Sequence, residues 1–111
     1  MQVDKKENYT ILADDKDDVK AFASYLEYIV PKAYKNDNLV IDILKYDNLE
    51  LHDLLAFLIL SNKRRAEKKS FVLVNKSLEL NKIPEEIMVV PTLREAKDVI
   101  DLEEVQRDLG F

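Results

Sequence analysis

The chain has 111 residues, the length of one domain, and 47% of them are hydrophobic, which supports a packed core. A formal net charge of −5 opposes non-specific binding to nucleic acid or to an anionic membrane. With no cysteine, one histidine and one glycine, the sequence excludes disulfides, ordinary zinc sites and the glycine-rich loops that hold nucleotides. We therefore expect residues 1–111 to form a single cytoplasmic domain with no membrane span and no cofactor.

The first third of the sequence predicts a β-hairpin followed by a helix. Residues 2–6 are a candidate short edge strand, and residues 9–13 are rich in strand-forming side chains. A plausible tight turn separates the two segments. The acidic residues 14–18 suit the start of a helix, where they cap free N–H groups. Apolar residues at helical spacing then form one face: Val19, Phe22, Ala23, Leu26 and Val30. Pro31 predicts that this helix ends or kinks there.

The centre of the chain predicts a strand, a helix and a second strand. Residues 39–44 are almost continuously apolar, as in a strand that is covered on both faces. Residues 49–69 have helical character, and the apolar stretch from Leu54 to Leu60 indicates deep burial on most sides. Residues 71–74 form a second apolar run. This spacing predicts a βαβ unit with two parallel strands and a right-handed crossover.

The last third predicts an irregular polar connection, a short strand and a final helix. Residues 75–86 are polar, and residues 87–90 are apolar. Thr92 and Glu95 have the spacing of a capping box, and Gly110 lies where a helix C-terminus favours a positive φ. The predicted order is β-β-α-β-α-β-β-α, an α/β fold in which helices cover a mixed sheet.

Two charged clusters offer chemistry, and each has a structural alternative. Asp14, Asp15, Asp17 and Asp18 are the ligand type that Mg²⁺ prefers, so a phospho-acceptor site at Asp14 and Asp15 is one hypothesis. Receiver domains carry such acids, but they also need a lysine after the last strand, where this chain has Pro91. We favour a solvated helix start.

The second cluster is basic and lies at the end of the predicted central helix. It comprises Lys63, Arg64, Arg65, Lys68 and Lys69. These side chains suit contacts with RNA phosphates or with an acidic partner, but cations also match the negative end of the helix dipole, and we favour that interpretation. His52, between Glu50 and Asp53, is interpreted in the same way as a surface histidine rather than a pH-sensitive contact.

The apolar runs at residues 40–44 and 71–74, the helix between them and the segment 89–96 resemble the STAS domain of sulfate transporters and anti-sigma factor antagonists. The resemblance implies a STAS-like α/β fold over roughly residues 9–109 and recognition of another protein, such as an anti-sigma factor-like regulator. It places recognition at the corner after the first apolar run, from Tyr46 to Asp53. The candidate protein-binding residues are Tyr46, Asn48, Glu50, His52 and Asp53.

The chain departs from that family at the residues that carry its signalling. The antagonists have a serine in this corner that their partner kinase phosphorylates, whereas residues 50–53 read Glu-Leu-His-Asp and contain no hydroxyl. We therefore expect a non-catalytic protein-interaction module without a phosphorylation switch. Residues 103–111 are similar to a compact STAS-like group of Bacteroidetes-type bacteria that is found with ribonuclease Z. The alternative function is thus an accessory to that RNA-processing enzyme.

Overall fold

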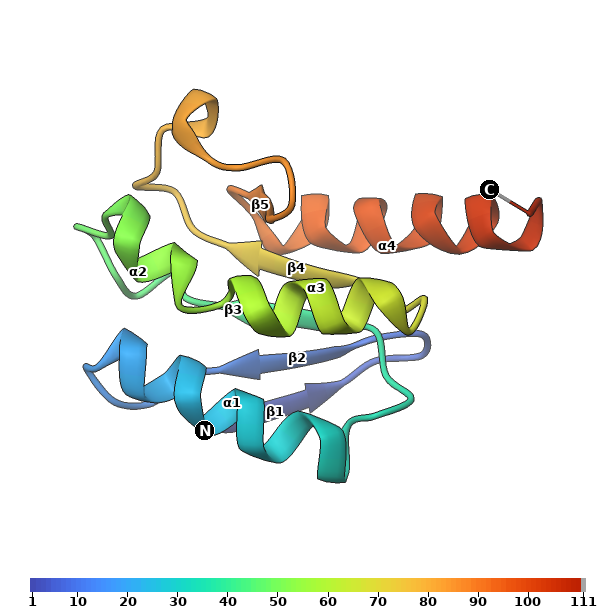
Figure 1. Ribbon diagram of the computed structural model, residues 1–111, viewed down its shortest axis with the longest axis horizontal. Helices are drawn as coiled ribbons and strands as arrows, with labels where there is room; N and C mark the ends of the chain where they lie inside the picture. The colour runs from blue at the N-terminus through green and yellow to red at the C-terminus, as the bar shows by residue number, and fades with distance from the viewer. Residues whose placement is uncertain (111) are drawn as a thin grey trace.

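A computed structural model describes residues 1–110 of the chain. Its five strands form one mixed sheet in the order β1-β2-β3-β4-β5 (Figure 1). The strands are β1 Gln2–Lys5, β2 Thr10–Ala13, β3 Leu39–Asp42, β4 Phe71–Val74 and β5 Met88–Val90. β1 pairs antiparallel with β2, whereas β2, β3, β4 and β5 run parallel to one another. The predicted hairpin, the parallel βαβ unit and the mixed sheet are confirmed.

Helices cover both faces of the sheet. α1 Val19–Ala33, α2 Leu51–Leu55 and α3 Leu58–Ala66 lie on one face, and α4 Leu93–Asp108 packs on the other (Figure 1). A short 3₁₀ turn, η1 Leu80–Lys82, lies in the connection between β4 and β5. The chain therefore has an α/β/α arrangement in which α4 alone covers one face.

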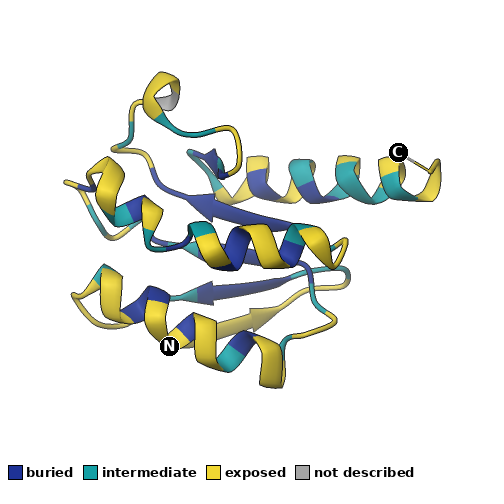
Figure 2. Ribbon diagram, in the orientation of Figure 1, coloured by how far each residue is buried: buried dark blue, intermediate teal, exposed yellow. Residues whose placement is uncertain are grey.

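The core divides into two layers because side chains alternate along each strand. On the face covered by three helices, Ile41 and Leu73 meet Phe22, Leu26 and other apolar side chains of α1, α2 and α3. On the opposite face, Val40 and Val72 pack against α4. Leu39, Val40 and Ile41 are fully buried, so the predicted double coverage of this strand is confirmed (Figure 2).

The predicted single helix over residues 49–69 is wrong. The segment forms two helices, α2 and α3, because a tight turn separates them at Ala56 and Phe57. The N–H of Phe57 donates to Leu54 O over 2.9 Å, a bond that spans three residues rather than four. Leu54, Phe57 and Leu60 are buried at this tighter spacing, so Leu55 and Ile59 turn outward and are 43% and 57% exposed.

Of the two outcomes predicted at Pro31, an end or a kink, the end of the helix is wrong, because α1 continues to Ala33. Pro31 removes one backbone donor in the last turn, where its ring is exposed and the cost is smaller than in a helix interior. The following bond still forms, from Tyr34 N to Val30 O over 2.9 Å.

The predicted caps at the start of α1 and at the start of α4 are confirmed, since a side-chain oxygen accepts a backbone N–H at each. The side chain of Asp18 accepts a hydrogen bond from Ala21 N over 3.0 Å, and Thr92 Oγ1 accepts from Glu95 N over 3.1 Å. Gly110 has a φ of +85° just after α4. Side-chain acceptors and a left-handed glycine therefore set the ends of these helices, as the sequence pattern indicates.

Arg64, placed by the sequence in a basic surface cluster, is 2% exposed and serves the fold. Its Nη2 donates to three backbone carbonyls of the α1–β3 connection, those of Tyr34 (3.2 Å), Lys35 (3.0 Å) and Asp37 (2.7 Å). Nη1 pairs with Glu67 at 3.2 Å. Burial lowers the pKa of Arg64, and the nearby carboxylates oppose that shift. This side chain therefore ties α3 to the connection that precedes the central strand.

Replacing Arg64 with alanine should lower the free energy of unfolding by about 2–4 kcal/mol, because three carbonyls lose their donor at once. Urea denaturation measures the change. Lys63→Ala, at an exposed neighbour, is the control and should change stability by less than about 0.5 kcal/mol. Equal effects of the two substitutions would contradict this role for Arg64.

Candidate protein-binding site

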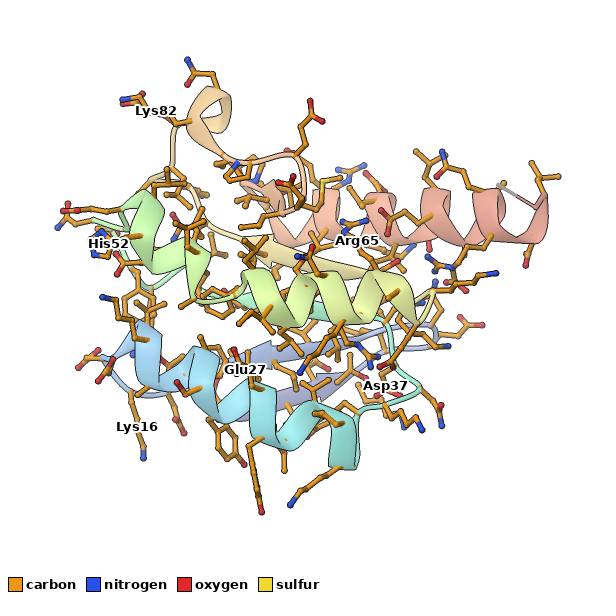
Figure 3. All side chains as sticks on the ribbon, viewed as in Figure 1. Lys16, Glu27, Asp37, His52, Arg65 and Lys82 are labelled. Carbon is orange, nitrogen blue, oxygen red and sulfur yellow. The ribbon has the colours of Figure 1, made fainter. Side chains whose placement is uncertain are left out.

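The loops that follow the parallel strands gather at the carboxyl edge of the sheet, where ligands of open α/β proteins commonly bind. Residues 14–18 follow β2, residues 43–50 follow β3, and Asn75 follows β4. Lys16 and His52 lie at this same end of the molecule (Figure 3). The fold therefore brings the predicted recognition corner beside the acidic loop that precedes α1.

Asn75 fixes the backbone of the corner. It is 2% exposed, and its Nδ2 donates to Ile43 O over 2.7 Å and to Tyr46 O over 2.9 Å. Its Oδ1 accepts from the backbone N–H of Ser77 over 2.9 Å. One buried amide thus holds the loop after β3 against the loop after β4, and a buried amide with these partners gives the corner a defined shape.

Tyr46 joins the corner to the acidic loop. Its hydroxyl donates to the carboxylate of Asp14 and lies 3.1 Å from Lys16 O. Burial raises the pKa of Tyr46, and the hydrogen bond to Asp14 raises it further. Lys45 adds an ion pair with Asp17 at 3.1 Å. Tyr46 is therefore turned inward, as a support for the surface.

The start of α2 carries three of the other predicted site residues. Asp53 Oδ2 accepts from Glu50 N over 3.0 Å, so Asp53 caps the helix and its side chain is only 17% exposed. His52 is 58% exposed and lies 3.3 Å from Glu50 and 3.5 Å from Asp53. Asn48 and Glu50 are exposed. Asn48, Glu50 and His52 are thus the members of the predicted set that a partner can reach.

Sequence reasoning missed three apolar residues on the same surface. Leu51, Leu55 and Ile59 are 42%, 43% and 57% exposed, although they are large and aliphatic. The four-residue interval from Leu51 to Leu55 places both on one face of α2. The signal was this interval, but the apolar stretch from Leu54 to Leu60, which contains Leu55 and Ile59, predicts burial on most sides.

A hollow of about 380 Å³ lies between the acidic loop and α1. Asp14, Phe22 and Tyr25 are among the residues that line it. At this edge, the acidic loop (residues 14–18) and the segment 45–53, which runs from the corner into α2, together hold seven carboxylates and two lysines. This excess equals the net charge of the whole chain, −5, so the acidic character is concentrated here.

The acidic loop does not assemble a metal site in the part of the chain that the structure describes. No three acidic or histidine side chains among residues 1–110 are arranged to hold an ion. Asp14 accepts from Tyr46, Asp17 pairs with Lys45, and Asp18 caps α1. Asp18 therefore forms the start of α1, whereas Asp14 and Asp17 each hold a side chain of the loop after β3.

The basic cluster at the end of α3 is also divided. Arg64 is buried, and Arg65 pairs with Glu103 of α4 at 3.5 Å. Lys63 and Lys68 are exposed. The cluster thus presents fewer cations to RNA than the sequence predicts.

Within residues 1–110, no helix has both the length and the apolar composition that a membrane span requires.

Tyr46→Phe should lower the free energy of unfolding by about 1–2 kcal/mol at neutral pH, because the Asp14 carboxylate loses a donor. The raised pKa of Tyr46 means that the unfolded chain releases this proton first, near pH 10. The stabilisation is therefore complete below that pH and shrinks as the pH rises toward the folded-state pKa. Urea unfolding of both proteins between pH 7 and about 11 tests this. A difference that grows above pH 10 would contradict it.

No protein-family model matches the chain, and no curated protein matches it. Among solved structures, the chain is similar to RsbS of Moorella thermoacetica, a STAS-domain anti-sigma factor antagonist, in a variant with one serine replaced by glutamate. The TM-score is 0.65 at 16% sequence identity, and the match covers 96% of this chain and 97% of RsbS. The comparisons do not support an association with ribonuclease Z. The chain has the STAS fold.

Proposed function

We propose that this chain is a non-catalytic regulatory module that binds another protein through the carboxyl edge of its sheet. The recognition surface consists of the corner and the outer face of α2 and α3: Asn48, Glu50, Leu51, His52, Leu55 and Ile59. Tyr46 and Asp53 support it from beneath. The similarity to an anti-sigma factor antagonist over nearly the whole chain supports a function in binding rather than in catalysis.

The observation that carries the proposal is the exposure of three aliphatic side chains next to charged ones. Leu51, Leu55 and Ile59 each keep more than 40% of their surface in water. Full burial of such a side chain contributes roughly 1.5–3 kcal/mol. Because about half of each surface is still exposed, a partner that covers all three gains roughly half of that amount per residue. Exposed apolar groups surrounded by polar ones are typical of protein interfaces.

The charges around these residues indicate the chemistry of the partner. Glu50 is exposed at the start of α2, and the acidic loop adds Asp15, Asp17 and Asp18 at the same edge. A complementary surface is apolar at its centre and basic at its rim. Such charges mainly increase the association rate and exclude acidic competitors, whereas the aliphatic contacts set the lifetime of the complex.

The surface needs no phosphate to be complete. Residues 50–53 contain no hydroxyl, and the hydroxyl of Tyr46 is bonded to Asp14. The side chain of Glu50 is 73% exposed at the N-terminus of α2, where a negative charge is stabilised by the helix dipole. We infer that this fixed charge makes recognition constitutive, although a carboxylate carries less charge than a phosphate.

A double substitution on α2 should abolish capture of the partner. We expect Leu51→Ser with Leu55→Ser to remove at least about nine-tenths of the specifically captured protein, because the centre of the interface loses its apolar contacts. Affinity capture from native lysate with quantitative mass spectrometry measures this. The matched control is Leu102→Ser with Val105→Ser, which changes two exposed aliphatic residues of α4. An equal loss of captured protein with both double substitutions, or no loss with either, would refute the assignment of the surface to α2.

Constitutive recognition should not depend on phosphorylation of the protein. Treatment of the purified protein with phosphatase should leave the captured amount unchanged, whereas Glu50→Lys should reduce it because the exposed charge at the start of α2 is reversed. Capture that requires a phosphorylated form of the protein would contradict the proposal.

A further inference from the structure

A second charged feature lies at the opposite edge of the sheet, where the parallel strands begin. A cleft of about 230 Å³ opens there between the end of α3 and the C-terminal half of α4. Arg65 lies between these two helices (Figure 3). The lining residues are Arg65, Lys68, Lys69, Glu103, Gln106 and Arg107. Four cations against one carboxylate is a marked local excess in a chain whose net charge is −5.

The single carboxylate of the cleft is occupied by protein donors. Glu103 is 17% exposed, accepts from Ser70 Oγ over 2.6 Å and pairs with Arg65 at 3.5 Å. It therefore positions Arg65 and cannot also neutralise the other three cations. Among the described residues, neither Lys68 nor Lys69 has an ion pair with a carboxylate.

The guanidinium N–H groups of Arg107 make only long contacts within the chain. Its two terminal nitrogens each lie 3.3 Å from Ser70 Oγ, and Nη2 lies 3.4 Å from Asn38 Oδ1. These contacts are long for hydrogen bonds to a guanidinium, which has five N–H groups in a planar fork. A doubly charged oxyanion offers such a fork shorter and stronger bonds than a hydroxyl and an amide do.

Lys68 occupies a position that favours glycine. Its φ is +61°, and the bonds from Lys69 N to Arg64 O (2.9 Å) and from Lys68 N to Arg65 O (3.0 Å) form a Schellman motif at the end of α3. Glycine adopts this conformation freely, whereas lysine is strained in it. The motif also satisfies the carbonyls of Arg64 and Arg65, so those two do not repel an anion.

We propose that this cleft binds the phosphate group of a small-molecule ligand. Its volume is below the roughly 300–1,000 Å³ that is usual for drug-sized ligands, which fits a phosphate or diphosphate group with the rest of the molecule outside. Arg107 and Arg65 supply directional donors, and Lys68 and Lys69 supply point charges at the rim. The site is independent of the protein-binding surface, which lies at the other edge of the sheet.

Titration with inorganic pyrophosphate, followed by NMR at constant ionic strength, tests the site on the full chain. We expect saturable shifts at residues 65–70 and 103–107, and Arg107→Gln should weaken binding at least about tenfold because charge-assisted hydrogen bonds are lost. Lys68→Gly should weaken binding and yet raise the urea midpoint of unfolding, since it removes both the charge and the strain. Lys20→Gln, on exposed α1, is the charge-matched control and should bind as the unmodified chain does.

Three results would overturn the proposal. The first is the absence of saturable shifts at low salt. The second is equal weakening by Lys20→Gln and Lys68→Gly, which would indicate a general effect of net charge. The third is tighter binding of a single-stranded RNA than of pyrophosphate with the same loss in Arg107→Gln, which would indicate a nucleic-acid surface instead.

Discussion

The central strand β3 is buried on both faces from Leu39 to Ile41, so these side chains are not available for recognition. Val40 and Ile41 point to opposite layers of the core and are fully buried in them. Polar functions are therefore displaced to the two ends of the parallel strands. The carboxyl edge holds an acidic loop and the exposed aliphatic face of α2, whereas the amino edge holds the basic cleft between α3 and α4.

The two edges are stabilised in the same way, by one buried side chain that donates to backbone carbonyls of a neighbouring connection. Asn75 does so at the carboxyl edge through Ile43 O and Tyr46 O. Arg64 does so at the amino edge through three carbonyls of the α1–β3 connection. Such groups satisfy backbone acceptors that water does not reach, so each connection is fixed against the element that supplies the donor.

The structural features that depend on a few neighbouring residues could be predicted from the sequence. The almost continuous aliphatic run at residues 39–44 identified the central strand, and Thr92 identified the start of α4, because both signals are contained in a few neighbouring residues. The break between α2 and α3 was not predictable from composition, since leucine occupies buried and exposed positions alike. Arg64 was assigned to the surface because its partners lie about thirty residues away in the sequence.

In the proposed function, the acidic, aliphatic end of the molecule is the part that meets a partner. Hydrogen–deuterium exchange of the chain alone and of its purified complex tests it directly, because amides under an interface lose access to solvent. We expect added protection over residues 45–59, with α4 unchanged. Protection confined to α4, with residues 45–59 exchanging as in the free protein, would contradict it.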